Sequence, residues 1–214
     1  GVRLVGSEMC IRDRLESVRK IIEYCIKYNV KTLTIYAFST ENWKRPTKEV
    51  DGLLKLFSES ISKESKKIHS NNIKLNFIGN TSIFTEAFQL KIKEVEKETF
   101  GNKKLVLNVA LNYGGRLDIV NSVNAFYYNK KKIKKITEKN INSGLYTKGN
   151  SDVDLLIRTG GQQRMSNFLL WQSAYAELFF SKKLWPDFDE KIFVDALYFF
   201  QITARKFGSI SKVS

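Results

Sequence analysis

The chain has 214 residues, a formal net charge of +14 and a pI near 9.7, which favours an anionic partner such as nucleic acid, a diphosphate or an anionic membrane face. Its two cysteines lack metal-site spacing, no run approaches the ~20 apolar residues of a membrane span, and no signal peptide is visible. These features argue against a disulfide scaffold or an integral membrane protein, and indicate one domain in a reducing compartment. Because the lysines are dispersed over presumed helix faces, most of the charge indicates a solvated basic surface.

Strands and helices alternate along the chain from Leu15 onward. Apolar residues at helical spacing predict helices over 15–28, 47–69, 83–99, 115–128, part of 136–146 and 188–206. Short β-rich runs predict strands over 31–38, 73–78, 104–111 and 153–157. The lysine run from 130 to 135 is most simply a solvated face. Alternating strands and helices predict a parallel α/β sheet in a single domain.

The segment 154–168 combines the features of an anion-binding site. Its apolar run predicts a short buried strand, and the glycines at 160 and 161 predict a turn that lets the backbone approach a ligand. Donors and helix-capping groups surround this turn, namely Arg158, Arg164, Ser166 and Asn167. Backbone N–H groups, a helix dipole and guanidinium forks would together favour phosphate. An ordinary strand-turn-helix connection with surface arginines would show the same pattern.

Two further features bear on a ligand site. Glu177 stands alone in an apolar and aromatic run over 168–180, and it either has a buried partner or a metal, or turns outward on a half-exposed strand. The polar loop 39–45 follows the strand predicted over 31–38. Because ligands of open α/β sheets bind beyond the carboxyl ends of strands, this loop and the segment 158–166 are expected to converge on one pocket.

A second glycine turn, Gly114-Gly115-Arg116, follows the strand predicted over 104–111 and opens a predicted helix. This placement fits a further anion-binding turn. It fits a tight packing turn equally well, and the sequence does not separate the two.

Five stretches are distinctive: YAFSTENWKRP (36–46), NVALNYGGR (108–116), DLLIRTGGQQRMSNFLLWQSAYAELFF (154–180), LWPDF (184–188) and RKFG (205–208). They closely resemble the cis-prenyltransferase family, and within it the branch that makes undecaprenyl diphosphate. The resemblance runs from about Leu15 to Phe207. It implies an α/β domain with a central, mostly parallel sheet flanked by helices, and an apolar product tunnel between helices and sheet. Candidates for the tunnel lining are Ala37, Leu54, Phe57, Phe84 and Phe88.

The resemblance implies a transferase that condenses isopentenyl diphosphate with an allylic diphosphate, usually farnesyl diphosphate. Each step forms a cis double bond, and the product is a long polyprenyl diphosphate such as undecaprenyl diphosphate, the lipid carrier precursor for cell-wall synthesis. Mg2+ and arginines would stabilise the departing diphosphate. The resemblance further implies a cytoplasmic homodimer with peripheral membrane contact for product release, and no nucleic-acid partner.

The resemblance also assigns roles to residues. Arg158, Arg164 and Ser166, with Met165 between them, match the positions for isopentenyl diphosphate. Glu177 matches a carboxylate that contributes to metal or water binding, often across the dimer interface. Asn42 matches a residue assigned to positioning or proton removal, and because a neutral amide is a poor base we expect it to orient the substrate. The adjoining substrate loop comprises Ser39, Thr40, Glu41, Trp43 and Arg45.

The chain departs from the family pattern in two places. Gln162-Gln163 stands where many bacterial members carry Glu-His, so we expect no metal role for Gln163. The sequence also lacks the family's first strand and its Asp-Gly-Asn-Gly-Arg-Trp loop, which cradles a diphosphate and holds Mg2+. We expect residues 1–14 to be a foreign or misassembled segment, residues 15–214 to be the domain, and this chain to be almost inactive as it stands. The single histidine, His69, lies within a predicted helix and cannot substitute.

Two other classes of protein are compatible with parts of the sequence. A non-catalytic partner subunit of a heteromeric prenyltransferase is the main alternative, although the retention of Arg158, Arg164, Ser166 and Glu177 argues against it. A basic nucleic-acid-binding domain fits the charge. The sequence carries no recognised nucleic-acid motif, however, and its basic residues are not interleaved with aromatics in one patch.

Overall fold

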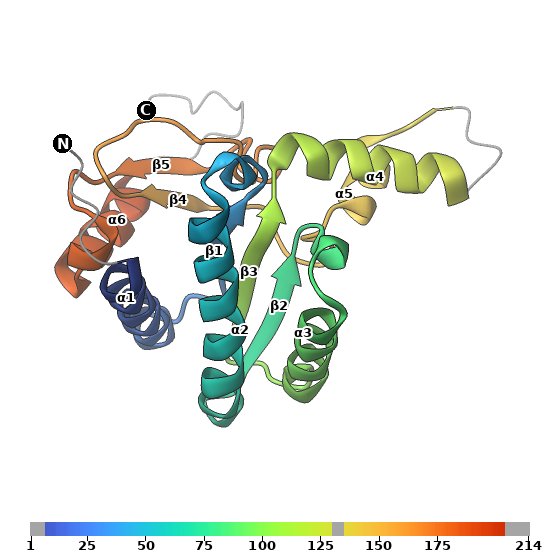
Figure 1. Cartoon of the computed structure of the whole chain (residues 1–214). Coiled ribbons are helices and arrows are strands. Elements are labelled where there is room, and N and C mark those ends of the chain that lie inside the picture. Colours follow the sequence, from blue (N-terminus) through green and yellow to red (C-terminus); the bar gives the residue numbers. More distant parts are fainter. Residues whose placement is uncertain (1–6, 130–134, 204–214) are drawn as a thin grey trace, which may run out of the picture.

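A computed structural model describes residues 7–129 and 135–203, with side chains from residue 15 onward (Figure 1). The helices are α1 (Ser7–Lys27), α2 (Thr47–Ser70), α3 (Glu86–Thr99), α4 (Gly115–Asn129), α5 (Glu138–Gly144) and α6 (Glu190–Ile202). The strands are β1 (Thr32–Ser39), β2 (Ile73–Ile78), β3 (Leu105–Tyr113), β4 (Leu155–Arg158) and β5 (Glu177–Phe180). Three 3-10 turns complete the described elements: η1 (Thr40–Lys44), η2 (Thr81–Ile83) and η3 (Trp185–Asp187).

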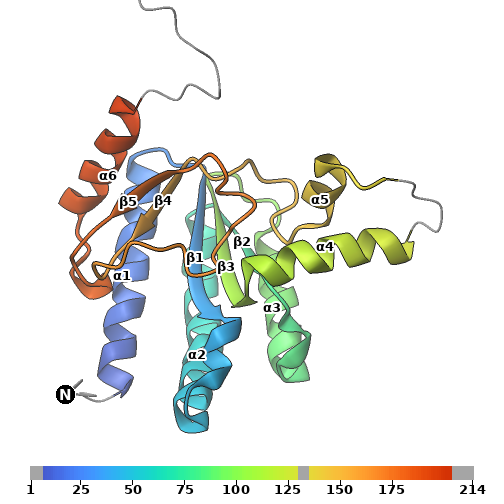
Figure 2. The same ribbon diagram turned by 90° about the horizontal axis from the view of Figure 1, so that it is seen from above.

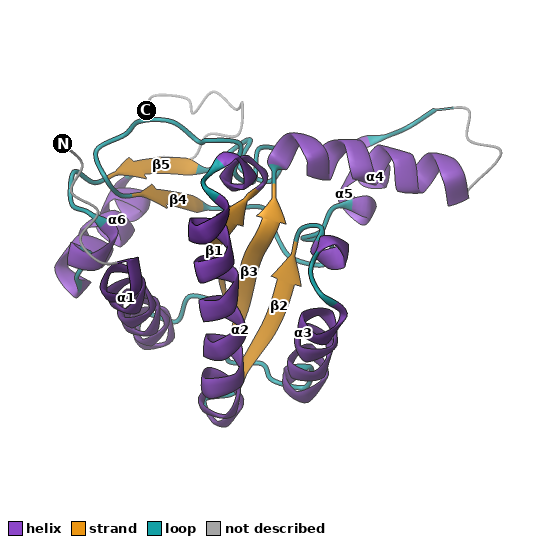
Figure 3. Ribbon diagram, in the orientation of Figure 1, coloured by secondary structure: helices purple, strands orange, loops and turns teal. Residues whose placement is uncertain are grey.

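All described strand pairs are parallel, which confirms the predicted α/β fold (Figure 3). β3 lies between β1 and β2, and β4 pairs with β5. Within residues 7–129 and 135–203, no pairing joins the three-stranded piece to the two-stranded one. The central strand β3 is a near-continuous apolar run and is largely buried, as expected for a parallel strand with neighbours on both sides.

The core lies between the sheet and the helices α1, α2 and α3. Figure 2 shows α2 and α3 on the same side of the three-stranded sheet. One apolar cluster joins α1 and α6 to the amino-terminal part of the sheet, including Ile21, Leu75, Leu107 and Phe193. A second cluster, here called the apolar cluster, lies near the carboxyl ends of the strands between α2 and α3. Its buried members are Phe38, Val50, Leu53, Phe84, Phe88, Ile92 and Leu111.

Most predicted elements are confirmed within one to three residues of their bounds. The first helix already begins at Ser7. The helix predicted from residue 83 begins only at Glu86, because Thr85 caps it by accepting the N–H of Phe88 at 3.4 Å. Three parts of the predictions lie outside the described residues. They are most of the lysine run (130–134), the end of the helix predicted over 188–206 (204–206) and the RKFG stretch.

The prediction that Ser166 and Asn167 open a helix is wrong. Residues 166–175 form successive turns and bends, and the backbone is left-handed at Ser166 (φ 49°), Asn167 (φ 60°) and Leu169 (φ 43°). Left-handed residues cannot continue a right-handed helix. A helix dipole therefore cannot contribute to an anion site at this point.

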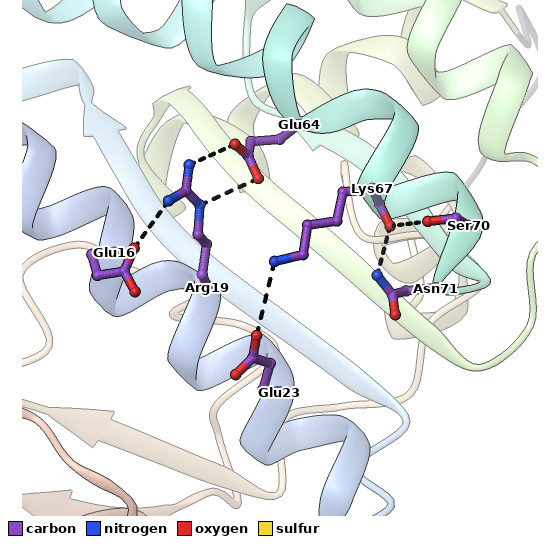
Figure 4. Close-up of polar contacts among 7 residues, drawn as sticks. All are labelled: Glu16, Arg19, Glu23, Glu64, Lys67, Ser70 and Asn71. Carbon is purple, nitrogen blue, oxygen red and sulfur yellow. Dashed lines mark hydrogen bonds and ion pairs between the residues drawn. The ribbon is translucent and has the colours of Figure 1, made fainter.

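Ion pairs fix helix α1 against helix α2 (Figure 4). The guanidinium of Arg19 contacts Glu64 through two nitrogens, at 2.7 and 3.3 Å, and Glu16 at 2.9 Å. Lys67 of α2 lies 4.0 Å from Glu23 of α1. These side chains are largely exposed, so the pairs orient the two helices more than they stabilise the fold. In the described part of the chain, no helix is both long and apolar enough to cross a bilayer.

Candidate active site

The polar loop after β1 begins as a closed turn. The backbone N–H of Ser39 donates to Asn42 Oδ1 at 2.9 Å, and Thr40 Oγ1 donates to Glu41 at 3.2 Å. Both bonds lie at the carboxyl end of the strand, where ligands of parallel sheets bind. Since the amide oxygen of Asn42 is used within the loop, its N–H groups are what Asn42 can offer to a ligand.

Trp43 is the residue of this polar loop that packs against the apolar cluster. Its indole N–H donates to Asn112 Oδ1 at 2.9 Å. Its ring meets Phe38 edge-on at 5.2 Å between centroids and lies 6.3 Å from Phe84. Trp43 is nevertheless 41% exposed, so part of this large aromatic side chain is accessible to a ligand.

Arg45 ends the predicted substrate loop and forms an ion pair on the surface. Its Nη1 lies 2.8 Å from Glu49 Oε1, one turn further along in α2. Both side chains are well exposed, so the pair is weak and can be exchanged for a bound anion at little cost. Arg45 is thus held at the same edge of the sheet as Ser39 and Asn42.

Two arginines lie together beyond β4. Arg158 Nη1 donates to Ser166 Oγ at 2.7 Å and to the carbonyl oxygen of Arg164, while Arg164 donates to the side-chain oxygen of Gln162. Partial burial, and then the charge of Arg164, lower the pKa of Arg158 below its ordinary value. In the part of the chain that the structure describes, neither guanidinium forms an ion pair. Met165 between them is half-buried. Two unpaired like charges held side by side favour a multiply charged anion.

The glycine turn after Arg158 does not offer its N–H groups to a ligand. Gly160 (φ 86°) donates to the carbonyl of Lys183 at 2.7 Å, and Gly161 (φ 73°) donates to that of Ser181 at 2.9 Å. The glycines are needed for these left-handed backbone angles. The prediction that backbone N–H groups of this turn cradle phosphate is therefore wrong, because the chain that follows β5 already satisfies them. The guanidinium groups must carry the anion site.

Asn167 joins the two predicted loops. Its Nδ2 donates to Glu41 Oε1 at 2.9 Å, which confirms that the loop after β1 and the arginine segment converge. Its backbone and side-chain oxygens accept the N–H groups of Gly115 at 2.7 Å and Arg116 at 2.9 Å. Asn167 thus caps helix α4 rather than a helix of its own. Burial works against ionisation of Glu41, but hydrogen bonds led by that of Asn167 lower its pKa.

The second glycine turn is a packing turn. A Cβ at Gly114 would lie 2.8 Å from both Thr40 Oγ1 and Asn167 Nδ2, and one at Gly115 would lie 2.9 Å from Leu170 Cγ. Since the N–H groups of Gly115 and Arg116 bond to Asn167, this turn holds the two loops close together. Of the two readings that the sequence left open, the structure favours packing.

Glu177 lies away from the arginines within one chain. It begins β5 opposite Leu155, whereas Arg158 ends β4 opposite Phe180. Three residues along parallel strands separate the two positions by about 10 Å. Glu177 is partly exposed on this short strand. One chain therefore brings together the loop after β1 and the arginine pair, but not the predicted metal ligand.

Two asparagines were missed or misread from sequence. Asn112 was not singled out, and Asn167 was predicted to cap the wrong helix. Both have left-handed backbones, with φ of 46° and 60°. Asparagine is several-fold enriched in this region. The signals that could have identified them are the position of Asn112 near the end of an apolar run, two residues before Gly114, and that of Asn167 directly after Ser166.

A parallel α/β domain with an arginine pair beyond its strand ends, beside a cluster of apolar side chains, defines an enzyme that holds an anionic substrate with an apolar tail. The chain belongs to the cis-prenyltransferase family: residues 7–208 match the family described as "Putative undecaprenyl diphosphate synthase". This match confirms the resemblance found in the sequence, and the expected class of enzyme, a transferase.

Relatives of known name agree with this assignment. The chain is 47% identical over 201 residues to the ditrans,polycis-undecaprenyl-diphosphate synthase ((2E,6E)-farnesyl-diphosphate specific) of Pasteurella multocida, covering 92% of this chain and 84% of that protein. It is 45% identical over 204 residues to the synthase of the same name from Buchnera aphidicola, covering 94% and 82%.

Two solved structures share the fold. A probable undecaprenyl diphosphate synthase from Campylobacter jejuni superposes with a TM-score of 0.84 at 34% identity, covering 92% of this chain and 93% of that one. Lavandulyl diphosphate synthase from Lavandula x intermedia, in complex with dimethylallyl diphosphate, gives a TM-score of 0.86 at 32% identity, covering 92% and 87%.

Proposed function

We propose that the chain elongates prenyl chains in cis, condensing isopentenyl diphosphate with farnesyl diphosphate to a long polyprenyl diphosphate such as undecaprenyl diphosphate. The observation that carries this proposal is the contact between Glu41 and Asn167, which joins the segment that carries the arginine pair to the loop whose Trp43 packs against the apolar cluster. The names of the relatives from Pasteurella and Buchnera support it.

The arginine pair would hold the diphosphate of isopentenyl diphosphate. Arg158 and Arg164 offer fork-shaped donors that match phosphate oxygens. Ser166, already 2.7 Å from Arg158 Nη1, would add a hydroxyl to the same group. Because the N–H groups of Gly160 and Gly161 are used within the protein, these side chains would supply most of the affinity for diphosphate.

The apolar cluster would hold the growing isoprenoid. All five residues predicted to line a tunnel meet here: Phe84 and Phe88 are buried members, while Ala37, Leu54 and Phe57 pack against them. An apolar chain that enters between α2 and α3 would exchange contact with water for contact with these side chains. The product would therefore grow into the space between α2 and α3.

The chemistry needs charge stabilisation and orientation. The bond from the allylic carbon to its diphosphate oxygen breaks, the isopentenyl alkene supplies the electron pair of the new carbon–carbon bond, and a proton leaves the isopentenyl unit. The arginines would fix the isopentenyl diphosphate so that its alkene faces the allylic carbon. Asn42 would orient a substrate through its N–H groups, since its oxygen holds the turn.

Mg2+ is proposed as the cofactor that neutralises the departing diphosphate. Among the described residues, no three His, Cys, Asp or Glu side chains gather into a metal site, and Gln163 is exposed and neutral. Mg2+ is commonly bound through one or two carboxylates together with substrate phosphates and water. Glu177 would supply such a carboxylate, together with ligands from outside the described residues of its own chain.

A homodimer would complete the site, with Glu177 acting across the interface. Helix α4 carries Leu117, Val120, Tyr127 and Tyr128 on one face, all exposed and Tyr128 by 76%. Figure 1 shows α4 extending away from the sheet. An exposed apolar face of this kind favours a partner. We further propose a cytoplasmic protein whose exposed Tyr198 and Ile202 on α6 touch a membrane during product release.

Incorporation of radiolabelled isopentenyl diphosphate, with farnesyl diphosphate and Mg2+, tests the function. This chain would be compared with a version that carries a strand and an Asp-Gly-Asn-Gly-Arg-Trp loop ahead of Leu15. We expect the longer version to make polyprenyl diphosphate and this chain to be far slower. If both are folded and neither incorporates label, a non-catalytic partner subunit is the better reading. Full activity of this chain would overturn our account of residues 1–14.

A further inference from the structure

Asn112 lies at the end of the central strand and connects the loops that follow both neighbouring strands. Its Oδ1 accepts the indole N–H of Trp43 at 2.9 Å, beyond β1. Its Nδ2 donates to the carbonyl of Asn80 at 2.8 Å, beyond β2, and its own carbonyl accepts the N–H of Asn80 at 3.3 Å. The residue is 6% exposed, so both ends of one buried amide are committed to neighbouring loops.

The orientation of this amide follows from the chemistry of its partners. An indole N–H can only donate and a carbonyl oxygen can only accept, so Oδ1 must face Trp43 and Nδ2 must face Asn80. The backbone is closely packed at the same place, since a Cβ at Gly79 would lie 2.1 Å from the carbonyl oxygen of Leu111. Asn112 therefore bonds to the Trp43 indole from a closely packed part of the backbone.

The indole is held where it can meet an apolar ligand. On one side it contacts Phe38 and Phe84, both buried members of the apolar cluster. Trp43 is nevertheless 41% exposed, so part of its side chain is accessible. With its one polar atom already bonded to Asn112, the indole presents a fixed apolar surface at the edge of the cluster.

We propose that Asn112 is a positioning residue for the allylic substrate. By bonding the Trp43 indole, it fixes the aromatic wall against which the apolar chain of farnesyl diphosphate enters the cluster. This inference rests on the proposed function. The side chain of Asn112 bonds to Trp43 and to Asn80, and to neither of the arginines that would hold isopentenyl diphosphate. Its loss should therefore weaken allylic binding and leave isopentenyl diphosphate binding unchanged.

Three variants separate the two bonds of Asn112. Asn112→Gly suits the left-handed backbone and removes both. Asn112→Asp keeps an acceptor for the indole and loses the donor to Asn80. Trp43→Phe keeps an aromatic ring and loses the indole N–H. If Asn112 acts through Trp43, Asn112→Gly and Trp43→Phe have similar effects on farnesyl diphosphate binding that do not add in the double variant. Asn112→Asp, which places a buried carboxylate beside the carbonyl of Asn80, lowers folding stability but keeps the indole bond and farnesyl diphosphate binding.

The first measurement is the indole N–H resonance of Trp43 in a 15N-labelled chain, assigned by its absence in Trp43→Phe. We expect it to shift and to exchange faster with water in Asn112→Gly, and to stay near its original position in Asn112→Asp. An unchanged resonance in Asn112→Gly would overturn the inference whether or not the chain binds substrate. If Asn112→Gly does not fold, an Asp variant whose indole signal resembles that of a solvent-exposed tryptophan would overturn it as well.

The second measurement is equilibrium binding of farnesyl diphosphate and, separately, of isopentenyl diphosphate. We expect Asn112→Gly and Trp43→Phe to weaken farnesyl diphosphate binding by about three- to tenfold, the range of one net hydrogen bond. Isopentenyl diphosphate binding should be unchanged. If farnesyl diphosphate binds neither the unaltered chain nor the version that carries the Asp-Gly-Asn-Gly-Arg-Trp loop, the proposed function fails. If the chain binds it and the variants bind equally well, or if both diphosphates weaken together, the positioning role fails.

Discussion

Asn167 Nδ2 donates to Glu41 Oε1 at 2.9 Å across 126 residues of sequence. This one contact joins the loop after β1 to the segment that carries the arginine pair. The remaining polar groups of Asn167 hold the first turn of α4, so three parts of the chain meet at one left-handed residue. The candidate site therefore depends on a residue that touches no expected reacting atom.

Replacement of Asn167 by glycine is expected to loosen the site. Glycine accepts the backbone angle, but it cannot bond to Glu41 or to the N–H of Arg116. We expect unfolding free energy to fall by about 1–3 kcal/mol, with weaker binding of both diphosphates because the two loops separate. Chemical denaturation and equilibrium binding measure the two effects.

Asn72→Gly is the matched control. Asn72 is also left-handed, with φ 57°, and its side-chain oxygen accepts the N–H of Lys103 at 2.9 Å, at the opposite end of the sheet. It should lose stability without losing diphosphate binding. If both variants bind substrate equally well, Asn167 has only a structural role.

Replacement of Arg158 by lysine is expected to show that geometry matters beyond charge. Lysine keeps the charge but cannot contact Ser166 and a phosphate with one planar fork. We expect kcat/KM for isopentenyl diphosphate to fall by about 10²–10³-fold, typical for the loss of a preorganised electrostatic group. The assay uses the version with the restored amino-terminal loop.

Arg19→Lys is the control for this arginine. Arg19 also makes a two-nitrogen contact, to Glu64, but it lies between α1 and α2. We expect its replacement to leave kcat/KM unchanged. Equal losses in the two variants would mean that Arg158 acts through the fold and not through the diphosphate.

Much of the fold follows from local sequence, because helical and strand periodicities report burial directly. The helix after Pro46 and the strand 73–78 are examples. The convergence of the loop after β1 with the arginine segment was also predicted, since parallel strands end at one edge of a sheet. That rule needs no knowledge of which strand pairs with which.

Partners distant in sequence could not be predicted. The segment after Phe168 has helical composition, yet left-handed residues and the hydrogen bond that Arg158 donates to Ser166 keep it in turns. The N–H groups of Gly160 and Gly161 are taken by residues 181–183, a pairing that no local pattern shows. Capping chemistry at Asn167 was recognised, but the helix that it caps begins 52 residues earlier in the chain, at Gly115.

Glu96 and Thr99 of α3 protect the free edge of β2, and this gives a prediction about pH. Glu96 Oε1 accepts the N–H of Phe77 at 2.7 Å, and Thr99 Oγ1 accepts that of Leu75 at 3.1 Å. Burial raises the pKa of Glu96, although the bond from Phe77 acts in the opposite direction. Its stabilising contribution is therefore complete below the unfolded pKa and is lost as pH rises through the folded pKa.

Glu96→Gln should stabilise the chain at pH 7 relative to the unaltered protein, because the amide oxygen still accepts the N–H of Phe77 and carries no buried charge. The gain should disappear near pH 3, below the ordinary glutamate pKa of about 4.3, where Glu96 is protonated in both states. Urea denaturation at the two pH values measures this. Glu98→Gln, an exposed residue of the same helix, should show no such pH-dependent gain. A loss of stability at pH 7 in Glu96→Gln would contradict the prediction.

The separation of Glu177 from Arg158 predicts complementation between defective subunits. If Glu177 serves the arginines of a partner, a mixed dimer of Arg158→Ala and Glu177→Ala chains contains one site with both residues intact and one with neither. We expect each variant alone to be nearly inactive, and mixing them after dissociation to restore part of the activity. Two Arg158→Ala preparations carrying different tags, mixed in the same way, control for exchange and should stay inactive.

The same mixture distinguishes the alternative arrangement. If Glu177 acts within its own chain, every site in the mixed dimer lacks one of the two residues, and mixing restores nothing. Recovered activity should also require Mg2+, with a metal dependence equal to that of the unaltered dimer, since the one intact site has its full set of ligands. The measurement is isopentenyl diphosphate incorporation by the version with the restored amino-terminal loop. Absence of recovery, despite tag-verified mixed dimers, would place Glu177 outside the partner's site.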